Sequence, residues 1–317
     1  MSVTEPLPDA AVPQAGDPVP PHAVAPAPPH AAPGAGAKSS AWSLKLRIVS
    51  GALFVPVLIL VTQTGGLAFL AFVGVQVLAG LYEFYRMART KDLEPSTLLG
   101  CVAGAGMVVL AYQPQFGQRD VLATAALLLV LGLALRQPTR PHRLESVAVT
   151  AFGVLWVGWL SAHLVLLREL PWIAGTEYSQ GASYVFLVFL TTWGCDTGAY
   201  VFGRMFGRNR PWTTISPRKS VEGSIGGFVC AGLAAFAARA WFAPYLRVGD
   251  ALVLGALVGV FAQVGDLVES LFKRDARQGD SSDLIPGHGG VLDRFDSLYF
   301  AAPIVYYYLK LAVFRVP

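Results

Sequence analysis

Long apolar runs separated by short polar loops fill this chain from about residue 46 to its end. A helix needs roughly 20 mostly apolar residues to cross the hydrocarbon core of a bilayer. Candidate spans fall near 48–65, 67–85, 96–113, 120–136, 146–167, 181–203, 222–243, 249–272 and 297–314. Only 14% of the residues are charged, whereas soluble domains carry about 25%. We therefore expect an all-α integral membrane protein with about nine transmembrane helices.

The first 43 residues have a different composition, because they are rich in Pro, Ala and Gly and contain almost no large apolar side chain. Such a segment buries too little surface to offset the entropy lost on ordering. We expect a disordered tail over 1–43, N-terminal transmembrane helices over 44–180 and a C-terminal transmembrane region over 181–317. Two basic loops, 203–221 and 273–296, belong to this last region.

The basic residues are distributed unevenly between the two sides of the predicted bundle. If the N-terminus is inside, 18 of the 24 lysines and arginines fall on the inner side, in the tail and in the loops 85–95, 136–145, 203–221 and 273–296. Cytoplasmic loops carry such an excess, so we expect a cytoplasmic N-terminus and an outside C-terminus. The net charge of +4 is spread over many loops, which argues against nucleic-acid binding.

Acidic residues interrupt two of the predicted spans: Asp196 the sixth, and Asp266 and Glu269 the eighth. Ionisable groups inside a membrane are energetically expensive and are functional by default. Asp266 follows an apolar run and favours a functional role, whereas Glu269 is equally compatible with a place in water at the interface. Asp266, Ser270 and Lys273 share one helical face. That face would present a carboxylate, a hydroxyl and an ammonium to a cytoplasmic cavity.

Residues 285–296 place three glycines, a histidine and two aspartates between apolar segments. Glycines let backbone N–H groups approach an anion closely. Asp293 and Asp296 begin the last helix, where they either cap it or bind a divalent cation such as Mg²⁺ that also holds phosphate oxygens. The nearby acids and Lys273 favour the metal. His288 has no ligand-spaced partner, so a hydrogen bond to a phosphate or an aspartate is favoured over zinc.

The loop 203–221 is strongly cationic and contains a compact Ser-Pro-Arg-Lys-Ser cluster before a Gly-rich helix. The positive-inside rule accounts for its arginines. It does not account for Ser216, Lys219 and Ser220 gathered at a helix start, an arrangement that favours an anion site.

Together these segments resemble the phosphatidate cytidylyltransferase (CDP-diacylglycerol synthase) family over residues 190–305. The matching segments are Trp193-Gly194-x-Asp196-x-Gly198-Ala199-Tyr200, Ser216-Pro217-x-Lys219-Ser220, Gly265-Asp266-Leu-x-Glu269-Ser270-Leu-Phe-Lys273-Arg274, Asp280, and Ile285-Pro286-Gly287-His288-Gly289-Gly290-Val-Leu-Asp293-Arg294-Phe-Asp296. One position departs from the pattern. Family members usually carry Lys where this chain has Gly279, so a phosphate-contacting cation is either missing or supplied by Arg277.

The resemblance implies that CTP and phosphatidic acid react to give CDP-diacylglycerol and pyrophosphate at a bacterial inner (plasma) membrane, with the active site facing the cytoplasm. It implies Mg²⁺, leaves a second, monovalent cation open, and is compatible with a homodimer. The expected catalytic residues are Asp266, Lys273, Asp293, Arg294 and Asp296, of which the three aspartates would bind the metal. The expected substrate-binding residues are Asp196, Ser216, Lys219, Ser220, Ser270, Arg274, Asp280, His288, Gly289 and Gly290.

Three other functions fit parts of the pattern. A CTP-dependent lipid kinase would also hold nucleotide phosphates at a membrane surface, but it would release CDP instead of pyrophosphate. A CDP-alcohol phosphotransferase is disfavoured, because the chain has no Asp-Gly-x-x-Ala-Arg helix. A transporter would carry paired, broken segments in its two halves, whereas the polar residues here gather in the last third.

Overall fold

The computed structural model describes residues 40–112, 142–282 and 289–316, with 124–125, 128–129 and 132 between them. Side chains are described from Gly51 onward. Residues 1–39 of the predicted disordered tail lie outside the described residues, whereas residues 40–43 belong to a helix. Most of the predicted span 120–136 and all of His288 also lie outside them.

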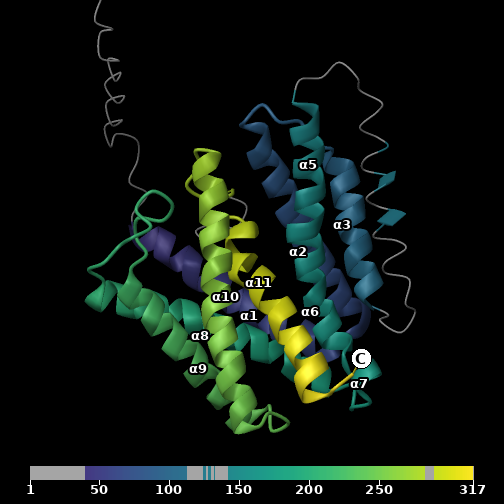
Figure 1. Cartoon of the computed structure of the whole chain (residues 1–317), viewed down its shortest axis with the longest axis vertical. Helices are drawn as coiled ribbons and strands as arrows, with labels where there is room; N and C mark the ends of the chain where they lie inside the picture. The colour runs from purple at the N-terminus through teal and green to yellow at the C-terminus, as the bar shows by residue number, and fades with distance from the viewer. Residues whose placement is uncertain are drawn as a thin grey trace, which may run out of the picture. The chain divides into compact units, whose positions relative to one another are not determined.

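Throughout the described ranges, every regular element is a helix (Figure 1). The elements are α1 (Ser40–Thr64), α2 (Gly66–Arg89), α3 (Thr97–Tyr112), α5 (Arg143–Gly153), η2 (Val154–Trp159), α6 (Leu160–Glu169), α7 (Pro171–Ala174), α8 (Gln180–Phe206), α9 (Val221–Trp241), α10 (Val248–Asp275), α11 (Leu292–Tyr308) and η3 (Leu309–Val313). They occupy eight of the nine predicted spans, and most of the ninth, 120–136, lies outside the described residues. The all-α prediction is therefore supported.

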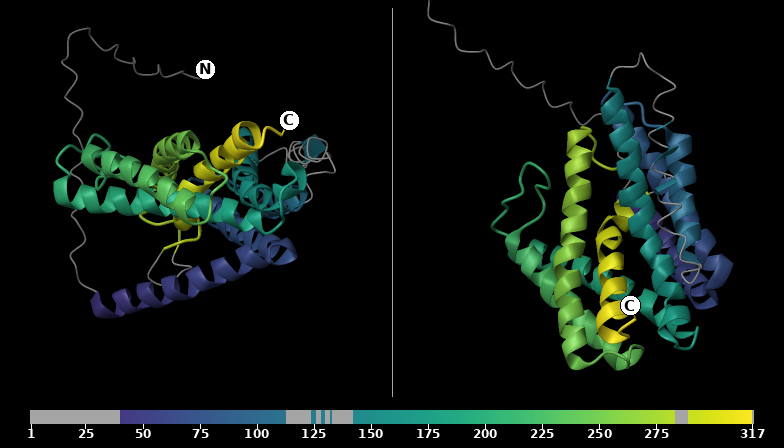
Figure 2. Two further views of the ribbon diagram at one scale, coloured as in Figure 1. Left: turned by 90° about the horizontal axis from the view of Figure 1, so that it is seen from below. Right: turned by 45° about the vertical axis from the view of Figure 1, so that its right-hand side comes forward.

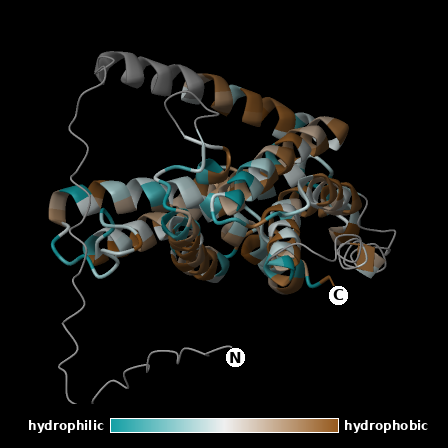
Figure 3. Ribbon diagram, turned by 90° about the horizontal axis from the view of Figure 1, so that it is seen from above, coloured by the Kyte–Doolittle hydropathy of each residue, from teal (hydrophilic) through white to brown (hydrophobic). Residues whose placement is uncertain are grey.

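In the part of the chain that the structure describes, 5 helices are long and apolar enough to cross a membrane. They are Gly66–Arg89, Arg143–Glu169, Gln180–Phe206, Val221–Trp241 and Val248–Asp275, and shorter apolar helices cover Gly51–Thr64 and Thr97–Tyr112. Hydrophobic residues make up much of the helices (Figure 3). Exposed large apolar side chains such as Leu67, Leu233 and Trp241 suit contact with lipid. An integral membrane protein is thus supported, while the number nine is not confirmed.

Small residues let the C-terminal helices pack closely. A Cβ atom added to Gly255 of α10 would lie 2.6 Å from the Cα of Gly232 in α9. One added to Gly265 of α10 would lie 2.6 Å from the carbonyl oxygen of Asp296 in α11. Glycine at such contacts allows close approach of helix backbones in membrane proteins. Gly265 therefore brings α10 against α11 close to the acidic residues of both helices. The two helices lie side by side in Figure 2.

A buried arginine joins the turn between α1 and α2 to the segment before α8. The Arg168 side chain is 1% exposed, and it donates to the carbonyl oxygens of Thr62 at 2.8 Å, Gln63 at 3.3 Å and Tyr178 at 3.0 Å. Its guanidinium also stacks 4.2 Å from the centre of the Tyr178 ring. These contacts lie at the end of α6 and before the start of α2. The acidic residues instead lie near the C-terminal ends of α2 and α10.

Candidate functional site

Three carboxylates meet where α10 contacts α11. Asp266 and Glu269 come from α10 and Asp296 from the second turn of α11, and each offers an oxygen atom within 4.8 Å of the other two. Glu269 is completely buried and Asp296 is 9% exposed, whereas Asp266 is partly exposed. This carboxylate cluster concentrates negative charge, and Asp266 is its most exposed member.

Two lysines balance part of this charge. Lys219, in the loop before α9, places its Nζ atom 2.7 Å from Oδ2 of Asp266. Lys273 of α10 lies 2.5 Å from Oε2 of Glu269 and 2.7 Å from Oδ1 of Asp293. Asp266, Ser270 and Lys273 lie on the one continuous helix α10, as their predicted shared face requires, and the Lys273 ammonium contacts Glu269 one turn earlier.

Asp293 lies beside the carboxylate cluster and holds the loop that precedes α11. Its Oδ2 atom accepts hydrogen bonds from the backbone N–H of Gly290 at 2.8 Å, and from the N–H and hydroxyl of Ser281 at 3.0 and 2.9 Å. Its other oxygen accepts from Lys273. Both oxygens therefore have donors within the protein, and the metal role of Asp293 stays a prediction.

Glu83 of α2 holds the same loop from the other side. Its carboxylate is 1% exposed and accepts four hydrogen bonds: from the hydroxyls of Ser281 and Ser282 and from the backbone N–H groups of Val291 and Leu292, at 2.5–3.2 Å. Sequence reasoning missed this residue. The signal was present, because Glu83 is an acid inside the predicted span 67–85, the criterion that singled out Asp196.

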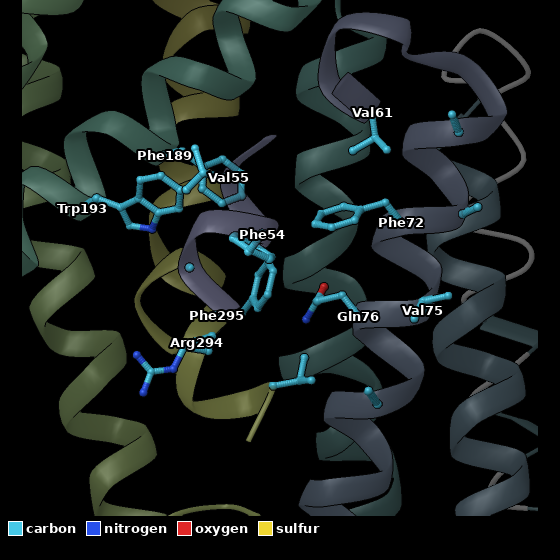
Figure 4. A pocket seen from close by; sticks show the side chains of 15 residues that line it. Phe54, Val55, Val61, Phe72, Val75, Gln76, Phe189, Trp193, Arg294 and Phe295 are labelled. Atoms are coloured by element: carbon cyan, nitrogen blue, oxygen red, sulfur yellow. The ribbon is translucent and has the colours of Figure 1, made fainter. Parts of the chain in front are cut away.

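An apolar cavity of about 690 Å³ lies next to the cluster, between α1, α2, α8 and α11 (Figure 4). Aromatic side chains dominate its walls, among them Phe54, Phe72 and Trp193. Among the described residues that line it, Arg294 of α11 is the charged one. The cavity therefore combines a surface suited to hydrocarbon with one cation.

Comparison with known proteins decides the family. The family model described as "Cytidylyltransferase family" matches residues 45–312. The chain belongs to the cytidylyltransferase family. It is 33% identical over 287 residues to a "Phosphatidate cytidylyltransferase" of Synechocystis, covering 84% of this chain and 96% of that protein. A protein of the same name from Staphylococcus epidermidis is 30% identical over 81% of this chain and 94% of its own length.

These findings confirm the resemblance seen in the sequence, and with it the prediction that the protein is an enzyme of the nucleotidyltransferase class. A third relative, the "Phosphatidate cytidylyltransferase" of Staphylococcus aureus strain COL, is 30% identical over 83% of this chain and 97% of that protein. The family match starts at residue 45 and so includes α2, whose Glu83 contributes to the site.

In this cytidylyltransferase, the carboxylate cluster fits a divalent cation. Both oxygens of Glu269 are buried and form no hydrogen bond with the described residues, although Oε2 lies 2.5 Å from the Lys273 ammonium. A buried carboxylate with unsatisfied oxygens costs free energy, and carboxylate oxygens are the ligands that Mg²⁺ prefers. The unsatisfied oxygens of Glu269 together with Asp266 and Asp296 thus form a suitable donor set.

Several residues predicted to bind substrate have structural partners in the cytidylyltransferase. The Ser220 hydroxyl accepts from the N–H of Gly223 at 3.1 Å and caps α9. Arg274 donates to the carbonyl oxygens of Ile215 and Gln278 at 3.2 and 2.9 Å, which ties the loop before α9 to α10. Ser216, in that loop, is partly exposed, whereas Ser270 is 7% exposed on α10.

The remaining predicted residues surround the cluster. Asp196 of α8 accepts from the hydroxyl of Ser297 at 3.5 Å, next to Asp296. Asp280 is exposed beside Ser281. The two described glycines of the motif approach protein carboxylates: a Cβ atom at Gly289 would lie 2.8 Å from Asp293, and one at Gly290 2.6 Å from Glu83. Glycine is required at both positions for that reason.

Proposed function

We propose that this protein transfers the cytidylyl group of CTP to phosphatidic acid, giving CDP-diacylglycerol and pyrophosphate. One observation carries the proposal beyond family membership: a cluster of carboxylates suited to a metal adjoins an apolar cavity that Arg294 lines. The consecutive residues Arg294, Phe295 and Asp296 connect the two. A soluble substrate would need no such cavity, whereas a lipid phosphate needs both surfaces.

The apolar cavity would receive the acyl chains, and Arg294 would bind the phosphate of phosphatidic acid. Aromatic and aliphatic walls bury hydrocarbon favourably, and a guanidinium forms bidentate contacts with phosphate oxygens. Figure 4 shows Arg294 at one end of the lining and Val61 and Phe72 toward the other. This arrangement would place the lipid headgroup next to Asp296.

In the proposed reaction, an oxygen of the lipid phosphate attacks the α-phosphorus of CTP in line. The new P–O bond forms as the bond from the α-phosphorus to the bridging oxygen breaks, and the electron pair leaves with pyrophosphate. The attacking phosphate is already anionic, so no strong general base is required. The barrier arises from bringing two polyanions together, which positioned cations lower.

Asp266, Glu269 and Asp296 would hold the metal, with Asp293 supporting them through Lys273. Bound Mg²⁺ would neutralise phosphate charge and polarise a phosphoryl oxygen. Lys219 would exchange its contact with Asp266 for a nucleotide phosphate, with Ser216 beside it. Asp196 would order the polar end of α8 through Ser297. The proposal also includes a second cation and a homodimer, which rest on the family resemblance. It places the site on the cytoplasmic side of a bacterial inner membrane, which rests on the resemblance and on the uneven distribution of lysines and arginines.

Purified full-length protein given labelled CTP, phosphatidic acid and Mg²⁺ should release pyrophosphate and form CDP-diacylglycerol, and EDTA should stop the reaction. Asp266→Asn should lower kcat by at least about 100-fold, since a metal ligand is lost. Asp275→Asn is the matched control, because Asp275 lies on the same helix and pairs with Lys91 outside the cluster. Release of CDP without pyrophosphate would replace the transferase by a lipid kinase. Full activity of Asp266→Asn would refute the metal assignment.

A further inference from the structure

The apolar cavity contains one side chain that hydrocarbon alone does not explain, the amide of Gln76. Gln76 belongs to α2 and is 4% exposed. Figure 4 shows its amide directed away from α2, toward the side of the cavity on which Phe295 lies. A polar group in apolar surroundings costs free energy unless it forms hydrogen bonds. The hydrogen bonds of this amide therefore indicate its role.

Only part of the Gln76 amide is satisfied within the described residues. Its nitrogen donates to the hydroxyl of Tyr299 in α11 at 2.9 Å. Its oxygen is buried and forms no hydrogen bond with the described residues. Because a side-chain amide has two N–H donors and an oxygen with two lone pairs, one side of this group is left for a partner from outside the chain.

Tyr299 fixes the position of the amide. Its side chain is 1% exposed, and a Cβ atom added to Gly80, one turn after Gln76, would lie 3.1 Å from the Tyr299 hydroxyl oxygen. A phenol donates as well as accepts, so the contact survives a half-turn of the amide, which exchanges its oxygen and nitrogen. After that half-turn the hydroxyl donates to Oε1, and the NH₂ group is the side without a partner.

The position of Gln76 along the cavity matches that of an ester in a diacyl lipid. In the view of Figure 4 the labelled side chains follow the order Arg294, Gln76 and Phe72. Phosphate, ester and hydrocarbon follow one another in the same order in phosphatidic acid. The carbonyl oxygens of its two esters accept hydrogen bonds and donate none, so they pair with an NH₂ group. An ether-linked lipid has no carbonyl at this place.

We propose that Gln76 selects ester-linked over ether-linked lipids, by donating a hydrogen bond from its amide to an ester carbonyl while the Tyr299 hydroxyl donates to Oε1. A site built to hydrogen-bond one group of its substrate rejects analogues that lack this group, because a buried polar atom is then left unpaired. This inference rests on the proposed function, in which the apolar cavity receives the lipid. Neither the family match nor the names of the relatives assign a role to Gln76.

The test compares two phosphatidic acids of equal chain length, one with two ester links and one with two ether links, at equal mole fraction in detergent micelles. One lost hydrogen bond at a buried polar group corresponds to about tenfold in affinity. The wild type should therefore have an about tenfold lower KM for the diester. Gln76→Met, which nearly keeps the shape of the side chain, should raise KM for the diester about tenfold and leave KM for the diether unchanged.

Thr62→Val is the matched control. Thr62 is also buried and its hydroxyl oxygen forms no hydrogen bond with the described residues, but it is not among the residues that line the cavity. Its ratio of the two KM values should equal that of the wild type, whereas Tyr299→Phe, which removes the group that orients the amide, should lower the ratio. A ratio in Gln76→Met equal to that of the wild type would overturn the inference.

Lipid binding without CTP separates this inference from the proposed function. A ligand that binds only the folded protein raises Tm more, the more tightly it binds. The diester should raise Tm of the wild type more than the diether does, and the two lipids should raise Tm of Gln76→Met equally, even if no CDP-diacylglycerol is formed. Equal shifts of the wild type with both lipids would count against Gln76 as the selecting residue, and turnover of CTP and phosphatidic acid would then leave the proposed function standing.

Discussion

Lys273 should be the cation whose loss costs the most stability. Its ammonium lies 2.5 Å from Glu269 and 2.7 Å from Asp293, and its side chain is 12% exposed. With an effective dielectric constant near 20, each pair attracts by about 6 kcal/mol. Desolvation of the three groups offsets much of this attraction, and breaking a buried ion pair by removing one partner typically costs about 3–5 kcal/mol. We expect a loss of that size for Lys273→Met, which keeps the length of the side chain.

The measurement is thermal unfolding of the purified protein in detergent, followed by loss of helical circular dichroism without added metal. At about 2–4 °C per kcal/mol, Lys273→Met should lower Tm by on the order of 10 °C. The double variant Lys273→Met, Glu269→Gln should recover part of the loss, because one of the two uncompensated charges is gone. A Tm within about 2 °C of the wild type for Lys273→Met would refute the reasoning, since these ion pairs would then carry little net free energy.

Two further predictions concern residues that hold the site and the bundle. Glu83→Gln should lower kcat more than about tenfold and lower Tm by a few degrees, because its amide group offers a donor where Ser282 and Val291 donate. Assays beside thermal unfolding check this, and an unchanged kcat would contradict it. Arg168→Met should lower Tm by several degrees, because three carbonyl groups would lose their hydrogen-bond donor. KM for CTP should not change, because these groups lie at the end of the helices opposite to the carboxylate cluster. A raised KM would mean that the two ends are coupled.

The sequence was sufficient for the helical architecture and for most of the acidic residues, because both produce local signals. A long apolar run predicts a helix whatever packs against it, and an acid within such a run is conspicuous. The same signal was present at Glu83, but this acid stands about 180 positions before Asp266. Its relevance depends on α2 passing beside the loop before α11, a tertiary contact that periodicity does not encode.

The sequence also did not predict which side chains contact one another within the cluster. Spacing alone placed Lys273 on the face of Asp266, but in the structure it contacts Glu269 and Asp293. Which acids meet depends on the register of α10 against α11. That register follows from the close approach at Gly265, where any side chain would separate the two helices.

The order of residues at the start of α11 explains how one short segment serves two different surfaces. Successive residues of an α-helix point about 100° apart, so positions three apart share a face while the residues between them do not. Asp293 and Asp296 accordingly both turn toward α10, where they meet Lys273 and the carboxylate cluster. Arg294 and Phe295 turn toward the apolar cavity. Arg294 is thereby placed in the lining of the apolar cavity, and in the proposed complex it would contact a lipid phosphate beside the metal.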